Sequence, residues 1–225
     1  PTRRSSDLLQ PAAASRRFPS YLAPAMTQLP ELPLTLSRQE IRKMIRQRRR
    51  ALTPEQQQEM GQQAATRMMT YPPVVMAHTV AVFLSFDGEL DTQPLIEQLW
   101  RAGKRVYLPV LHPFSAGNLL FLNYHPQSEL VMNRLKIHEP KLDVRDVLPL
   151  SRLDVLITPL VAFDEYGQRL GMGGGFYDRT LQNWQHYKMQ PVGYAHDCQL
   201  VEKLPVEEWD IPLPAVVTPS KVWEW

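Results

Sequence analysis

The chain has 225 residues, of which 44% are hydrophobic and 21% charged, with a formal net charge of +2 at pH 7. This length predicts one domain that buries about 70% of its unfolded surface, so neither disulfides nor a structural metal is needed. The single cysteine, Cys198, excludes an internal disulfide and fits the reducing cytoplasm. The low net charge and the lack of an apolar run of roughly 18 residues predict no nucleic-acid or membrane partner, and we expect a monomer.

Residues 1–36 differ in composition from the rest of the chain. They are rich in Pro, Ser and Ala and show no sustained hydrophobic periodicity, which predicts a disordered N-terminal extension. Met26 is a plausible native start, so we interpret residues 1–25 as an upstream extension without a folding role. Their arginines and few acidic residues leave a transit peptide as the alternative. Residues 37–225 are expected to form one domain.

The first predicted helix begins at a capping box made of Ser37 and Glu40. Seven basic residues lie between positions 38 and 50, and four of them share one face of the helix: Arg38, Arg42, Arg46 and Arg49. By spacing alone, such a run most often marks a solvated face, and an RNA-binding helix is the next alternative. A second capping box, Thr53 with Gln56, predicts another helix to about Met69.

Strands and helices alternate along the remainder of the chain. Apolar runs predict strands at residues 79–86, 105–111, 119–124, 155–163, 191–195 and 215–218, and a helix is expected between Thr92 and Gly103. This order predicts an α/β fold, a doubly wound and mostly parallel sheet sandwiched by helices. Ligands of such sheets lie beyond the C-terminal strand ends, so the loops after Phe86 and Phe163 should face one crevice.

Four glycines lie between the strand that ends at Phe163 and a helix expected from Phe176: Gly171, Gly173, Gly174 and Gly175. Each costs roughly 0.5–1 kcal/mol relative to Ala in regular structure, so such a run suggests left-handed backbone or close approach to a ligand. An anion held by free N–H groups is the usual ligand at this place. The loop matches neither a Walker A motif nor a dinucleotide fingerprint, and a tight connection is the simplest alternative.

The segment RLGMGGGFYDR, residues 169–179, closely resembles the signature of the 5-formyltetrahydrofolate cyclo-ligase (5,10-methenyltetrahydrofolate synthetase) family. The resemblance extends from about Arg38 to the C-terminus. It implies an ATP- and Mg²⁺-dependent cyclisation of 5-formyltetrahydrofolate to 5,10-methenyltetrahydrofolate, with release of ADP and phosphate. Phosphorylation of the formyl oxygen would make that oxygen a leaving group.

The resemblance also implies the site residues. ATP would contact Arg38, Arg42, Arg169, Leu170, Gly171, Met172, Gly173, Gly174, Gly175, Phe176 and Tyr177. The folate would contact Leu84, Glu89, Gly173, Gly175 and Phe176, and Mg²⁺ would be held by Asp178 and Asp210. Without the resemblance, Asp178 and Asp210 are also typical capping residues, and Glu89 is also typical of a helix start.

Two positions depart from the family pattern and shift the expected phosphate contacts. Many relatives have basic residues where Met172 and Gly174 stand, so phosphate charge here would fall on backbone N–H groups and on Arg38, Arg42, Arg169 and Arg179. Pro214 replaces an acid common in relatives, which weakens the assignment of Asp210. Two other classes stay open: a basic-helix RNA-binding protein, and a phosphosugar isomerase or CoA-transferase-like enzyme on a similar fold.

Overall fold

A computed structural model describes residues 36–225 of the chain. The predicted extension, residues 1–36, therefore lies outside the described residues except for Leu36. The α-helices are α1 (Arg38–Arg50), α2 (Pro54–Thr70), α3 (Pro72–Met76), α4 (Gln93–Arg101) and α5 (Phe176–Leu181). Both predicted capping boxes are present, with the side chains of Ser37 and Thr53 accepting hydrogen bonds from backbone N–H groups at the starts of α1 and α2. None of these described helices is long and apolar enough to cross a membrane.

The main sheet has eight strands in the order β13-β12-β10-β7-β1-β2-β3-β6. The neighbours from β12 to β2 are parallel, and β13, β3 and β6 pair antiparallel at the two edges. The strands are β1 (Thr79–Ala81), β2 (Arg105–Leu111), β3 (Leu119–Tyr124), β6 (Val147–Leu148), β7 (Val155–Thr158), β10 (Gln190–Tyr194), β12 (Ala215–Val217) and β13 (Val222–Glu224). The predicted doubly wound, mostly parallel sheet is confirmed.

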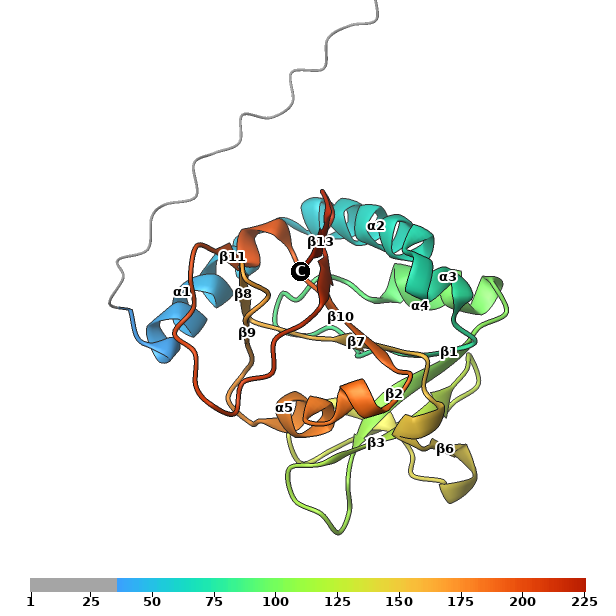
Figure 1. Cartoon of the computed structure of the whole chain (residues 1–225). Helices are drawn as coiled ribbons and strands as arrows, with labels where there is room; N and C mark the ends of the chain where they lie inside the picture. Colours follow the sequence, from blue (N-terminus) through green and yellow to red (C-terminus); the bar gives the residue numbers. More distant parts are fainter. Residues whose placement is uncertain (1–35) are drawn as a thin grey trace, which may run out of the picture. The chain divides into compact units, whose positions relative to one another are not determined.

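Helices cover both faces of this sheet (Figure 1). One buried cluster joins α2, α3 and α4 to the sheet through residues such as Met68, Leu99 and Val80, and another places Leu181 of α5 beneath the opposite face. Helix α1 packs elsewhere. Its buried Ile41 and Ile45 contact a smaller sheet made of β8 (Ala162–Asp164), β9 (Arg169–Leu170) and β11 (Leu200–Val201).

The structure differs from the predicted elements at two strands and one helix. The run 155–163 is not one strand, because it leaves the main sheet after Thr158 at Pro159, which lacks the N–H that a central strand needs. It continues as β8, which forms an antiparallel pair with β9. The glycine loop therefore follows a β8–β9 hairpin instead of a strand of the main sheet. The run 79–86 pairs only as far as Ala81, and the predicted break after Tyr71 contains the short helix α3.

Candidate active site

A cavity of about 630 Å³ lies beyond the C-terminal ends of β1, β2 and β7. Both loops expected to share a crevice contribute to it, as predicted from the strand order. Its lining contains most of the sequence-predicted site residues: Arg38, Arg42, Leu84, Glu89, Arg169, Gly171, Met172, Gly173, Gly174, Gly175, Phe176, Tyr177 and Asp178. Leu170 is instead buried in the cluster beneath α1. Asp210 does not line the cavity but binds Arg38, which does.

Two of the four glycines have left-handed backbone. Gly173 has φ 100° and Gly175, the residue before α5, has φ 68°. A Cβ atom on Gly175 would lie 2.7 Å from a guanidinium nitrogen of Arg179, which is the movable end of an exposed side chain, so the left-handed backbone is the feature that favours glycine here. The loop backbone lies at the cavity wall beside the guanidinium of Arg42. A Cβ atom on Gly173 would lie 3.7 Å from that guanidinium.

Helix α1 directs its first two spaced arginines toward the cavity. The Nε of Arg42 donates a hydrogen bond to the Gly171 carbonyl at 2.7 Å. Arg38 forms a two-pronged ion pair with Asp210, with an Nη2–Oδ1 distance of 2.9 Å, and this bond raises the pKa of Arg38. The interpretation of this face as merely solvated is therefore wrong, because these arginines have specific partners within the protein.

The two candidate metal ligands are each paired with an arginine. The buried guanidinium of Arg169, whose side chain is 2% exposed, binds the carboxylate of Asp178. Burial lowers the pKa of Arg169 and the charge of Asp178 opposes this shift. Burial alone would raise the pKa of Asp210, but hydrogen bonds from Arg38 and from the Glu207 N–H outweigh it and lower the pKa.

Asp178 and Asp210 suit magnesium by the chemistry of their donor atoms. Mg²⁺ prefers oxygen ligands and often takes only one or two carboxylates, with water and phosphate completing its shell. Two carboxylates lie here, each paired with an arginine, and among residues 36–225 there is no group of three or more His, Cys, Asp or Glu side chains that could hold a metal. The set therefore fits a magnesium ion shared with a phosphate ligand better than an all-protein metal cage.

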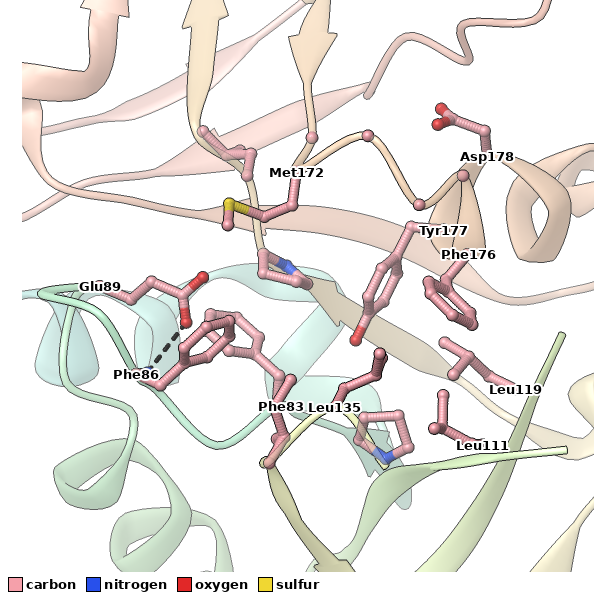
Figure 2. A pocket seen from close by; sticks show the side chains of 18 of the residues that line it. Phe83, Phe86, Glu89, Leu111, Leu119, Leu135, Met172, Phe176, Tyr177 and Asp178 are labelled. Atoms are coloured by element: carbon pink, nitrogen blue, oxygen red, sulfur yellow. Dashed lines mark hydrogen bonds between the residues drawn. The ribbon is translucent and has the colours of Figure 1, made fainter. Parts of the chain in front are cut away.

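The loop after β1 supplies a buried carboxyl to the other side of the cavity. Glu89 is 8% exposed and accepts a hydrogen bond from the Phe86 N–H at 3.1 Å (Figure 2). Burial raises the pKa of Glu89 to about 7, although this hydrogen bond and the charge of Arg49 act against the rise. Near neutral pH this carboxyl can therefore hold or release a proton.

Two consecutive residues of α5 point in opposite directions. Tyr177 reaches into the cavity toward Phe83 and Leu135, whereas the Asp178 carboxylate points to the other side of the helix start, away from the Tyr177 ring (Figure 2). Burial raises the pKa of the Tyr177 hydroxyl, and the negative charge of Glu89 adds to the rise, so the phenol stays protonated. The neutral ring faces the interior of the cavity and the carboxylate of Asp178 remains with the charged groups around Arg169.

The sequence did not predict the apolar wall of the cavity, which is formed by Phe83, Phe86, Leu111, Leu119, Leu135 and Ile137. Leu135 and Ile137 come from the hairpin of β4 (Leu130–Met132) and β5 (His138–Pro140), in a region that the sequence left irregular. The Glu139 carboxylate orders this hairpin by accepting hydrogen bonds from the Leu111 N–H at 3.0 Å and the Asn133 amide at 2.9 Å. The sequence signal for this part of the wall was the presence of the apolar Leu135 and Ile137 within an otherwise polar segment.

Known proteins resemble this chain along most of its length. Residues 35–219 match the model of the 5-formyltetrahydrofolate cyclo-ligase family. The chain is 53% identical over 179 residues to the 5-formyltetrahydrofolate cyclo-ligase of Haemophilus influenzae, covering 80% of this chain and 96% of that protein. It is 31% identical over 188 residues to the protein of the same name from Mycolicibacterium smegmatis, covering 82% of this chain and 95% of the relative. The 5,10-methenyltetrahydrofolate synthetase structure from Aquifex aeolicus superposes with a TM-score of 0.72 at 28% identity, covering 84% of this chain and 93% of that one.

Proposed function

Because this chain belongs to the 5-formyltetrahydrofolate cyclo-ligase family, we propose that it catalyses the ATP- and Mg²⁺-dependent conversion of 5-formyltetrahydrofolate to 5,10-methenyltetrahydrofolate. The observation that carries the proposal is one cavity lined by the glycine loop, by Arg38 and Arg42, and by the buried Glu89. Membership of the family makes the protein a ligase. ATP, magnesium and the residue roles are the proposed part.

The proposed reaction has two stages. The formyl oxygen attacks the γ-phosphorus of ATP, the bond to the β-phosphate oxygen breaks, and ADP leaves. N10 of the folate then attacks the activated formyl carbon, closes the ring and loses its proton, and inorganic phosphate departs with the former formyl oxygen. No nucleophile of the protein is required, so the protein contributes positioning and charge stabilisation.

We assign the phosphate chain of ATP to the glycine loop and the arginines of α1. Gly173 and Gly175 leave the loop backbone accessible, and Arg42 is already anchored against it by its bond to the Gly171 carbonyl. Asp178 and Asp210 would hold magnesium, which when bound neutralises phosphate charge during transfer. Arg38 and Arg169 would balance the charge of these carboxylates before the ligands arrive.

We assign the folate to the apolar wall and to Glu89. A flat pterin suits a surface made of Phe83, Leu119 and Leu135, since most ligand pockets combine apolar walls with a few polar groups. Glu89 lines this part of the cavity and has a pKa near neutrality, which suits it to take the proton that N10 loses. We propose that this reaction takes place in the cytoplasm, which suits the single cysteine.

A direct assay tests the proposed function. Purified protein with 5-formyltetrahydrofolate, ATP and Mg²⁺ should produce the absorbance of 5,10-methenyltetrahydrofolate, and omission of ATP or addition of a chelator should abolish it. A phosphosugar isomerase, a CoA-transferase-like enzyme or an RNA-binding protein would produce no such product. Absence of the product from folded protein at saturating substrates would overturn the proposal.

A further inference from the structure

An exposed tryptophan stands at the margin of the cavity. Trp209 lines the cavity, yet it is 65% exposed. Other tryptophans have partners: Trp100 contacts Tyr124, Trp223 contacts Phe163 and Lys221, and the Trp225 indole donates to a backbone carbonyl. Among the described residues, no aromatic or cation–π pair and no hydrogen bond involves the Trp209 side chain. Because the indole lies at the margin of the cavity and has no aromatic partner within residues 36–225, its face is free to stack on a flat aromatic group of a ligand.

The loop that carries Trp209 is attached to the charged end of the cavity on both sides of the indole. On one side, the Pro205 carbonyl accepts a hydrogen bond from Arg38 at 3.2 Å. On the other, Asp210 is paired with Arg38 and the Ile211 N–H donates to the Asp178 carboxylate at 3.4 Å. Within the loop, the Asp210 carboxylate accepts from the Glu207 N–H at 2.9 Å. Trp209 is therefore held beside the residues assigned to phosphate and metal.

The charge and polarity of the cavity divide it into two parts. The apolar wall with the buried Glu89 suits the folate, and the glycine loop with Arg38 and Arg42 suits a polyphosphate. A nucleoside triphosphate also has a flat aromatic base, which the backbone N–H groups and arginines of the phosphate part do not recognise. Aromatic side chains bind such bases by stacking on their π-faces.

We infer that Trp209 is the platform on which the nucleobase of ATP stacks. The inference rests on the proposed function for the identity of the nucleotide. It adds a base-binding contact to a phosphate site made of the glycine loop and α1. Because stacking needs only a π-face, Trp209 should contribute affinity for purine nucleotides in general, with little discrimination between ATP and GTP.

Binding measurements on the whole protein test this inference separately from turnover. We expect Trp209→Ala to weaken ATP binding about tenfold by calorimetry, the order of loss that follows removal of an aromatic stacking partner. Trp209→Phe should retain most of the affinity, and the ATP-induced quenching of tryptophan fluorescence should be lost in both variants. Phe114→Ala, a change at another exposed aromatic residue that does not line the cavity, serves as the control and should bind ATP normally.

Inorganic tripolyphosphate locates the contact within the nucleotide. Its affinity should be the same for wild type and Trp209→Ala, because it has no base. Equal weakening of tripolyphosphate and ATP would overturn the inference by showing that Trp209 supports the phosphate site. Unchanged ATP affinity, or a rise in KM for the folate alone, would also overturn it, the latter placing the indole against the folate. If the wild-type protein binds ATP normally but does not cyclise the folate, the proposed function is contradicted. The binding measurements on Trp209→Ala would still decide whether the indole stacks on the base.

Discussion

The fully buried guanidinium of Arg49 binds both the backbone carbonyl and the carboxylate of Asp87, with Nε–O and Nη2–Oδ2 distances of 2.8 and 3.1 Å. Asp87 has left-handed backbone with φ 55° and also receives hydrogen bonds from Arg46 and Arg50. Burial alone would raise the pKa of Asp87, but these three arginines lower it. Helix α1 is thus bound to the loop of Glu89 as well as to the glycine loop.

Asp87→Asn should therefore destabilise the protein. It leaves the Arg49 guanidinium, which is 0% exposed, without its counter-charge, and breaking a buried ion pair costs about 3 kcal/mol. The free energy of unfolding, measured by urea denaturation, should fall by that order, and KM for the folate should rise because the Glu89 loop loses its anchor. The control is Asp143→Asn, which removes an exposed pair with Arg145 and should change little. Similar small effects from both variants would contradict this role of Asp87.

Glu89 should make stability depend on pH. Its pKa rises on folding from 4.5 to about 7, so the folded protein keeps a proton that the unfolded chain releases. The stabilisation that comes from this retained proton is complete below pH 4.5 and is lost as the pH rises through 7. The free energy of unfolding should fall by about 3 kcal/mol over this range.

Comparison with Glu89→Gln isolates this effect. The free energy of unfolding of the wild type minus that of the variant, each measured by denaturation, should decrease between about pH 5 and pH 8. Burial lowers the pKa of His196 to about 4, so this residue makes the free energy of unfolding decrease as the pH falls below 6.5. Both proteins contain His196, so its contribution cancels in the difference. A difference that does not vary with pH would show that Glu89 titrates normally.

Arg42→Ala should weaken ATP binding selectively. The side chain lies against the glycine loop, and loss of a charge-assisted hydrogen bond costs roughly 1.5–3 kcal/mol, or at least about tenfold in KM for ATP. KM for the folate should stay near its wild-type value in steady-state kinetics. Lys43→Ala, the next residue on an exposed position of the same helix, should leave both constants unchanged. A rise for the folate alone would assign α1 to the other substrate.

Asp178→Asn should lower turnover by orders of magnitude and also lower the melting temperature. Loss of the carboxylate removes a magnesium ligand, and it also leaves the buried guanidinium of Arg169 without its partner. Turnover per folded molecule, measured at a temperature where circular dichroism shows the variant folded, separates the two effects. Partial recovery at high Mg²⁺ is expected. Normal turnover of the folded variant would mean that magnesium is held elsewhere.

Patterns among residues close together in the sequence were sufficient to predict many of the helices and strands of this protein and its family. The capping boxes at Ser37 and Thr53, the glycine loop and α5 each depend on residues a few positions apart, and the structure confirms them. The alternation of apolar runs and helices predicted the sheet. The signature at residues 169–179 predicted the family, and the comparisons confirm it.

Only the tertiary structure decided how the charged residues are paired and which apolar residues form the cavity. Arg38 and Asp210 are 172 positions apart, and Arg49 and Asp87 are 38 positions apart, so no local spacing identifies either pair. The Leu135 hairpin and Trp209 likewise reach the cavity from segments without periodic structure. A charged or apolar residue has the same local pattern whether it faces water or a partner, because burial and pairing depend on where distant segments meet.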